Sequence, residues 1–286
     1  MTQQVSTNNS FPPVSTLRNI CNDVRRLVLR MSYRAGNVGS HLGGALSMVE
    51  VLCVLFFTEL KFNITNPRWE GRDRFILSKG HGSPSLYAVM AKAGIIDANL
   101  LSTFKANGSH LSAHPSMNLD LGLEFSTGSL GQGLSYGVGT ALALRRLGNE
   151  QSRVFVLLGD GELNEGSVWE AAMSAAHFSL KNLVAIVDCN GLQQDGRTDQ
   201  VMSLGNLRAK WLSFGWNAIE IDGHDLDQIS SALKTRSETP VAIIANTIKG
   251  KGISFMEANR SWHHSRLTEK QLQEALLELE DNGDDR

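Results

Sequence analysis

Two short apolar runs, 154–158 and 183–187, constrain the fold of this chain more than any other feature. Neither run alternates with polar residues, which is typical of parallel strands that are buried on both faces. The segment between them, 165–177, has the pattern of a helix. Together they predict a strand–helix–strand unit, in which two parallel strands are joined by a helix that packs on the sheet.

Polar residues follow both runs where the strands should end. Gly159-Asp160-Gly161 follows the first run, and Asn190 follows the second. An aspartate between glycines alone indicates a turn more often than a metal ligand. A second polar residue at a strand end favours the metal ligand over the turn. Ligands of open α/β sheets bind at the carboxyl edge, and side-chain oxygens suit Mg²⁺ or Ca²⁺. The two glycines would let the backbone approach phosphate oxygens closely.

The rest of the chain continues the alternation of strands and helices. Further strands are expected at 74–77, 216–221 and 241–245, and further helices at 15–34, 47–58, 82–93, 131–147, 206–214, 225–235 and 268–280. Ser47 with Glu50 and Thr268 with Gln271 have the spacing of capping boxes at the starts of two helices. This order predicts an α/β fold with a mainly parallel sheet and helices on both faces.

Composition sets the class of protein. We expect residues 1–13 to be a flexible arm and residues 14–286 to form a single domain. The net charge of −2, without a dense basic stripe, argues against nucleic acid as the main partner. Three cysteines without metal-like spacing fit a reducing, cytoplasmic compartment. The longest apolar stretch, 51–57, is too short to span a bilayer, and residues 1–10 lack the apolar core of a signal peptide.

Four histidines fall in loops rich in glycine or small residues: His41, His81, His114 and His263. A single histidine is usually structural, but four in such loops favour a polar pocket suited to hydroxyls and phosphate. Their spacing lacks the helical pair of zinc peptidases. His110, His177 and His224 are assigned to structure or surface, and His264 is left open.

Glycines also mark the start of the helix expected at 131–147. Residues 128–133 form a glycine-rich segment that is either a flexible helix start or a bare backbone on which a flat ring can rest. Gly137 and Gly139, inside the helix, predict close packing against another backbone.

Six segments occur in the order found in one family: 39–44, 73–87, 125–133, 159–166, 188–196 and 248–256. From about residue 17 to about residue 268, the chain resembles the amino-terminal half of a transketolase. That half is the diphosphate-binding domain of a thiamine diphosphate enzyme. The resemblance therefore implies the thiamine diphosphate-binding fold and thiamine diphosphate as the cofactor.

The resemblance also implies roles around the cofactor. Asp160, the Asn190 side chain and the Leu192 carbonyl would bind Mg²⁺, or Ca²⁺ or Mn²⁺ in its place. The amide of Gly161 would donate to the diphosphate. Asn190 would contact the cofactor in addition to binding the metal ion. Further cofactor contacts are implied at positions around the rings and the diphosphate: His81, Gly128, Leu130, Glu165 and His263. Of these, Glu165 would join an acidic network that links paired active sites.

Catalytic roles are implied for three histidines. His41 and His263 would transfer protons to and from substrate hydroxyls, and His114 would contact the donor hydroxyl beside the bond that breaks. Two positions depart from the family, because Ala113 and His264 stand where glycine is common. Both residues add bulk near the substrate channel and so bear on the choice of acceptor.

The implied activity is transfer of a two-carbon ketol unit from a ketose or ketose phosphate to an aldose. Only the first domain of a transketolase is matched, which implies a partner subunit with the pyrimidine-binding and carboxyl-terminal domains, in an α₂β₂ assembly. One alternative is the E1 α-type subunit of a thiamine enzyme acting on a 2-oxo acid. The other is a non-catalytic binding protein that keeps the fold. The four histidines favour sugar hydroxyls.

Overall fold

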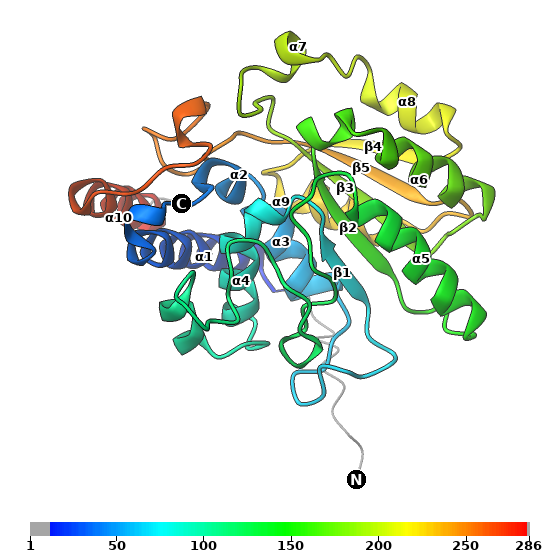
Figure 1. The fold of residues 1–286 in the computed structure, drawn as a ribbon, viewed down its shortest axis with the longest axis horizontal. Helices are drawn as coiled ribbons and strands as arrows, with labels where there is room; N and C mark the ends of the chain where they lie inside the picture. The colour runs from blue at the N-terminus through cyan, green and yellow to red at the C-terminus, as the bar shows by residue number, and fades with distance from the viewer. Residues whose placement is uncertain (1–11, 285–286) are drawn as a thin grey trace.

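The computed structural model describes residues 12–284, and most of the arm expected at 1–13 lies outside them. Five strands form the sheet, β1 (Arg74–Leu77), β2 (Val154–Gly159), β3 (Leu183–Cys189), β4 (Asn217–Asp222) and β5 (Val241–Asn246). Their order is β1-β2-β3-β5-β4, and all four pairings are parallel (Figure 1). The predicted parallel α/β sheet is confirmed.

Helices cover both faces of the sheet, as expected (Figure 1). One face packs against α1 (Val14–Arg34), α3 (Val49–Val54), α4 (Ser83–Lys92) and α9 (Leu226–Lys234), with α10 (Glu269–Asp284) lying on α1. The other packs against α5 (Gly133–Arg146), α6 (Gly166–His177) and α8 (Leu207–Ser213).

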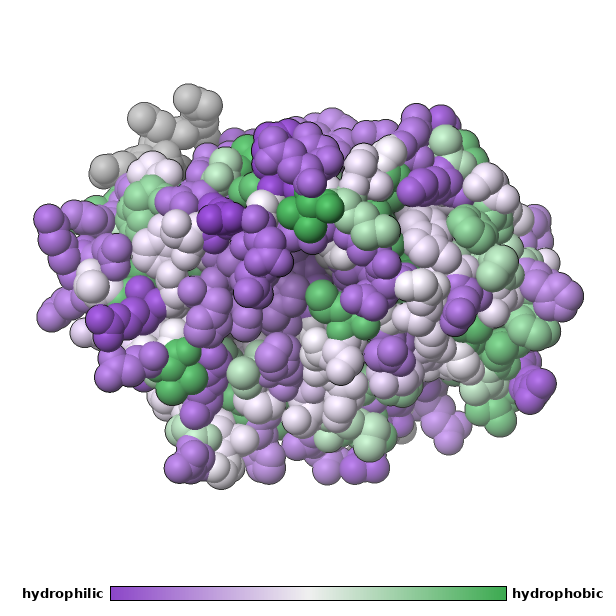
Figure 2. Space-filling view, turned by 45° about the horizontal axis from the view of Figure 1, so that its top comes forward, coloured by the Kyte–Doolittle hydropathy of each residue, from purple (hydrophilic) through white to green (hydrophobic). Residues whose placement is uncertain are grey.

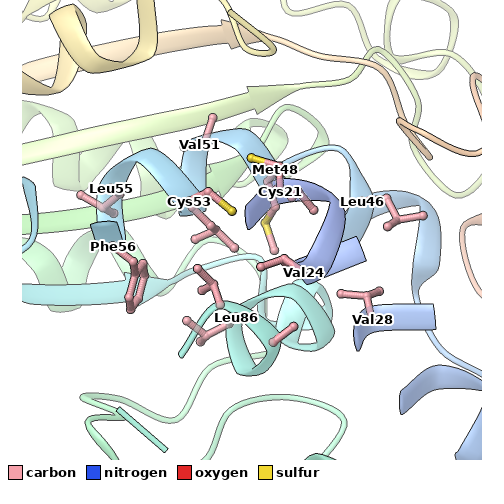
Figure 3. Packing of buried hydrophobic residues seen from close by; sticks show 14 of the residues in the cluster. Cys21, Val24, Val28, Leu46, Met48, Val51, Cys53, Leu55, Phe56 and Leu86 are labelled. Carbon is pink, nitrogen blue, oxygen red and sulfur yellow. The ribbon is translucent and has the colours of Figure 1, made fainter. Parts of the chain in front are cut away.

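Each central strand supplies side chains to both cores. Phe155 of β2 belongs to the core beneath α1, α3 and α4, whereas Val156 belongs to the core beneath α5 and α6. Successive side chains of a strand point to opposite faces, so a strand covered on both faces must be apolar throughout. Figure 3 shows part of the first core, where Val24, Cys53 and Leu86 come from three different helices.

The helix expected at 47–58 is wrong in its boundaries. The chain instead forms α2 (Leu42–Leu46), then α3, then a π-helical turn at Leu55–Glu59. Ser47 does not cap a helix, because its hydroxyl donates to Asp188 Oδ2 at 2.6 Å. A fully buried carboxylate needs donors, and this need outweighs a helix cap. The second capping box is confirmed, since Gln271 N donates to Thr268 Oγ1 at 3.3 Å and Thr268 N to Gln271 Oε1 at 3.0 Å.

Short elements also occur between the expected strands and helices. A helical turn, α7 (Thr198–Val201), lies between β3 and α8, where no helix was expected. Turns of 3-10 helix occur at Gly36–Val38, Gly80–Gly82, Ala98–Thr103, Leu119–Leu121, Gly161–Asn164 and Arg260–Trp262. Among the residues described, no helix combines the length and apolar character needed to cross a membrane.

Candidate functional site

Five histidines meet at the carboxyl edge of the sheet. Measured between ring centroids, His41 lies 5.3 Å from His81, 6.0 Å from His114, 5.4 Å from His263 and 4.5 Å from His264. These residues come from the start of α2, the turn after β1, the loop before α5 and the turn at 260–262. The structure thus brings the four predicted histidines together and adds His264. We call these five residues the histidine cluster.

Burial keeps the histidine cluster uncharged near neutral pH. It lowers the pKa of His41 to about 3, with smaller contributions from His264, His263 and His114. Burial, followed by the charge of Lys249, lowers the pKa of His263 to about 4. Burial is also the main cause of the lowered pKa at the other three. A neutral imidazole has one donor and one acceptor, so each ring can bind a hydroxyl in either sense.

A buried ion pair lies beneath the cluster. Lys79 and Asp188 each expose 1% of their side chains, and the ammonium donates to Asp188 Oδ2. Burial raises the pKa of Asp188, but the charge of Lys79 and the donated hydrogen bonds outweigh it and bring the pKa below its usual value. Neither residue was predicted from the sequence to have a role. The feature of the sequence that could have indicated this ion pair is Asp188, which directly follows the apolar run 183–187.

Asp160 follows β2 and faces the segment after β3. Its Oδ1 accepts from Gly161 N at 2.8 Å, and its Oδ2 accepts from Gly191 N at 2.8 Å and from the Thr198 hydroxyl at 3.1 Å. Burial, and then the charge of Asp188, raise the pKa of Asp160. Because Gly159 pairs with Asp188 in the sheet, the predicted neighbourhood of Asp160 and the 190–192 segment is present.

Lys249 links the 190–192 segment to the histidine cluster. Its ammonium donates to the Leu192 carbonyl at 2.9 Å and lies 3.0 Å from His263 Nδ1. Burial, with help from the charge of Lys79, lowers the pKa of Lys249 to about 8. Lys249 lies in the family-like segment 248–256, but no function was predicted for it from the sequence. Because it accepts from the Lys249 ammonium, the Leu192 carbonyl is already oriented toward a positive charge.

The donor set near Asp160 fits a hard cation. It comprises a carboxylate, the Asn190 amide oxygen and the Leu192 carbonyl, which are the oxygen types that Mg²⁺ and Ca²⁺ prefer. Asn190 Oδ1 presently accepts from Leu192 N at 3.1 Å, which orients this amide. Within residues 12–284 no group of three or more histidine, cysteine, aspartate or glutamate side chains is placed to hold a metal ion. This set is compatible with that finding, because only Asp160 belongs to those types.

The glycine-rich segment 128–133 is held in place by Glu162. This buried carboxylate accepts from Gly131 N at 2.8 Å, from Gly159 N at 3.1 Å and from the Ser78 hydroxyl. Gly128 has φ 143°, and a Cβ there would lie 3.1 Å from the His114 ring. Bare backbone therefore lies against the histidine cluster at this point. Leu130 is half-buried beside it, and Glu165 is exposed.

Lys105 lies at the edge of the cluster. It is half-buried, has φ 61°, and donates from its ammonium to the Gly39 carbonyl at 2.6 Å. A positive φ is uncommon for a residue with a long side chain. Within the described part of the chain, Lys105 forms no ion pair with a carboxylate. Figure 2, which brings the α7 side of the molecule forward, shows a recess in that face bordered largely by hydrophilic side chains.

Comparisons with known proteins identify the family of this chain. The family described as "Transketolase, thiamine diphosphate binding domain" matches residues 17–281. The chain is 43% identical to the 6-deoxy-6-sulfo-D-fructose transketolase subunit SqwG of a Clostridium species, covering 93% of this chain and 97% of that protein. It is 40% identical to an apulose-4-phosphate transketolase subunit of Phocaeicola vulgatus, covering 89% of this chain and 90% of that protein.

Full-length transketolases match over a smaller part of their own length. Human transketolase is 38% identical over 93% of this chain but only 42% of the human protein. The crystal structure of Campylobacter jejuni transketolase superposes with a TM-score of 0.86 at 30% identity, covering 98% of this chain and 43% of that one. The chain thus spans less than half the length of these two proteins.

Proposed function

Because this chain belongs to the transketolase family and matches its thiamine diphosphate binding domain, we propose that it is one subunit of a two-chain transketolase. The assembled enzyme transfers a two-carbon ketol unit from a ketose or ketose phosphate to an aldose. Relatives named as transketolase subunits match over nearly their whole length, which supports this activity over the alternatives of 2-oxo acid chemistry and of a non-catalytic protein.

One observation supports the proposal most directly. Neutral histidines lie beside an oxygen donor set, and a single lysine joins the two, since Lys249 contacts both Leu192 and His263. A diphosphate with its cation suits the oxygen side of this arrangement, and a polyhydroxylated substrate suits the histidine side. Lys105, which forms no ion pair among the described residues, suits an anionic group such as a sugar phosphate.

The cofactor contacts follow from this arrangement. Asp160, Asn190 and the Leu192 carbonyl hold the cation, for which we propose Mg²⁺, with Ca²⁺ or Mn²⁺ as substitutes. The Gly161 amide, which now donates to Asp160, exchanges this partner for the diphosphate. We assign the ring contacts to Gly128 and Leu130. Thiamine diphosphate supplies the electron sink for cleavage of the carbon–carbon bond, and the protein positions it.

The histidine cluster serves the substrate. His41, His114 and His263 bind substrate hydroxyls and move protons between them, a task for which a neutral imidazole has both a donor and an acceptor. His81, whose ring lies 5.7 Å from that of His263, contacts the cofactor together with His263. His264 stands at the exposed side of His41 and narrows the approach to it.

A partner subunit supplies the domains that full-length transketolases have beyond this region, and we propose an α₂β₂ assembly. Its contact surface includes Glu165, which is exposed beside the glycine-rich segment. The three free cysteines fit the reducing cytoplasm that we propose as the compartment.

The test is ketol transfer by the chain together with a co-purified partner, with thiamine diphosphate and Mg²⁺ present. A panel of ketoses and ketose phosphates is offered as donors, and decarboxylation of pyruvate is measured in parallel. We expect aldose-dependent consumption of at least one ketose. Decarboxylation of a 2-oxo acid without any ketol transfer would refute the proposal.

A further inference from the structure

A buried triad holds the loop 248–252 from the side that faces away from the histidine cluster. Arg25 Nη2 donates to Glu50 Oε1 at 2.5 Å, and His224 Nδ1 lies 3.1 Å from Glu50 Oε2. Burial raises the pKa of Glu50, but Arg25 and His224 outweigh it and bring the pKa to about 2. Glu50 is therefore an ionised centre with a partner on each oxygen. We call Arg25, Glu50 and His224 the outer triad.

Both ends of the outer triad bind the backbone of the loop. Arg25 Nε donates to the Lys251 carbonyl at 3.0 Å, and His224 Nε2 accepts from Ile248 N at 2.9 Å. Because Nε2 accepts, the proton of the neutral ring must be on Nδ1, from which it is donated to Glu50. The triad thus binds the amide just before Lys249 and a carbonyl two residues after it.

The loop has little freedom between these two anchors. Gly250 N donates to the Gly43 carbonyl of α2 at 2.9 Å. A Cβ at Gly252 would lie 2.5 Å from Arg25 Nε, so the backbone packs directly on the guanidinium. Lys249 itself is 2% exposed and ends on the Leu192 carbonyl and His263. A buried ammonium depends on fixed acceptors, because losing one of them leaves a charge without compensation.

We infer that the outer triad is a positioning device for Lys249: it fixes the loop so that the ammonium stays between the Leu192 carbonyl and His263. The effect on the loop depends only on the hydrogen bonds described above. The effect on the cofactor rests on the proposed function, in which Leu192 is a ligand of the cation and the ammonium beside it lies near the diphosphate, an anion that a fixed positive charge attracts. Arg25, Glu50 and His224 are positioning residues and touch neither cofactor nor substrate.

Two substitutions of His224 distinguish the loss of the hydrogen bond to the loop from the loss of the imidazole ring itself. His224→Phe removes the acceptor for the Ile248 amide, and its ring has room because His224 borders a cavity of about 780 Å³ between α1, α9 and the loop. His224→Gln keeps a carboxamide oxygen that can accept from Ile248. Arg26→Met is the matched control, because Arg26, also on α1, donates from Nη2 to the Leu279 carbonyl of α10 at 2.7 Å and does not touch the loop.

Two measurements are made on each variant. Hydrogen exchange of the chain is followed in peptides covering 247–256 and 269–280. Thiamine diphosphate affinity is measured by calorimetry on the complex of the chain with its partner subunit, in the presence of Mg²⁺. For His224→Phe we expect faster exchange only in 247–256 and about tenfold weaker cofactor binding, as a lost buried hydrogen bond implies. His224→Gln should stay within about threefold of the wild type. Arg26→Met should speed exchange only in 269–280 and leave affinity unchanged.

Unchanged exchange in 247–256, or unchanged affinity despite faster exchange there, would overturn the inference. If the wild-type complex bound no thiamine diphosphate, the proposed function would fail, and exchange in 247–256 alone would then decide whether the triad positions the loop. If His224→Phe did not fold, Arg25→Lys would replace it. A lysine keeps the charge opposite Glu50 but has one nitrogen in place of the two that bind Glu50 and the Lys251 carbonyl, so the bond to the loop is weakened and the same exchange pattern is expected.

Discussion

At the scale of single residues, Asp160 shows how a buried carboxylate is kept available for a cation. Two backbone amides and one hydroxyl point at its carboxylate. Such a set keeps the charged form available although burial raises its pKa. This is the environment that a cation needs, because a carboxyl group binds a hard cation in its ionised form.

Asp160→Asn should therefore weaken binding of thiamine diphosphate with Mg²⁺ by about 10²-fold or more, given that even supporting residues of metal sites often count for tenfold or more. Calorimetric titration of the complex measures this directly. Asp199→Asn is the control, since Asp199 is exposed and pairs with Arg197 at the surface. Equal affinity of the Asp160 variant and the wild type would remove Asp160 from the cation site.

The histidine cluster makes a second prediction at this scale. His41 has a folded pKa of about 3, against an ordinary value of 6.5. Below pH 6.5 the unfolded chain takes up a proton at this position while the folded chain does not, so stability is fully present above 6.5 and is lost as pH falls toward 3. The urea concentration at the midpoint of unfolding should decrease as the pH is lowered from about 7.5 to about 5. The decrease should be less steep in His41→Asn.

His110→Asn is the control for this pH series, because His110 lies outside the histidine cluster. Its midpoint should follow the wild-type curve across the same range. A His41→Asn curve parallel to the wild type would show that His41 is not a source of the acid sensitivity.

At the scale of elements, α5 shows how one helix is placed by a missing side chain. A Cβ at Gly137 would lie 2.6 Å from Val156 Cγ2 of β2, whereas nothing lies within 4 Å of the same position at Gly139. The predicted close packing is thus present at Gly137, where the neighbours are side chains rather than backbone, and absent at Gly139. The helix rests on the strand that leads to Asp160, so this contact also fixes the carboxyl edge.

Gly137→Ala should destabilise the isolated chain by about 1–3 kcal/mol, because a methyl group added to a packed core forces its neighbours to move. Gly139→Ala should instead stabilise it by about 0.5–1 kcal/mol, the usual gain from replacing an exposed helical glycine. Urea unfolding of the two variants measures both effects. Equal shifts of the same sign would mean that α5 does not rest on β2 at this distance.

At the scale of the whole molecule, the site has one open side. The histidine cluster reaches the surface at His264, and Glu165 beside the glycine-rich segment is exposed. Full-length transketolases contain more than twice the length that this chain matches. A partner that covers this side would exclude water from the reacting groups and strengthen the electrostatic interactions among them.

The purified chain alone, with thiamine diphosphate and Mg²⁺, should therefore show no ketol transfer above background. Activity should rise as the partner is added and level off when the two chains are equimolar, as titration with a coupled assay would show. Full turnover by the single chain would contradict the need for a partner. A plateau at another ratio would contradict α₂β₂.

Features that are encoded locally could be predicted from the amino-acid sequence. Continuous apolar runs fix β2 and β3, because a strand covered on both faces has no position for a polar side chain. The carboxyl ends of parallel strands lie at one edge, so the neighbourhood of Asp160 and Asn190 also followed from the sequence. The Thr268 capping box was predictable because its partners lie three residues apart.

Contacts between distant groups depend on how the elements pack. Lys79 and Asp188 are 109 positions apart, and their pairing depends on how β1 and β3 lie across β2. The same holds for Lys249 with Leu192, and for His264, whose neighbour His41 is far away in the chain. Ser47 fits a capping pattern, yet it turns to Asp188 because burial makes an unpaired carboxylate more costly than an uncapped helix. Local patterns encode elements and their ends, whereas long-range burial decides which polar groups must find one another.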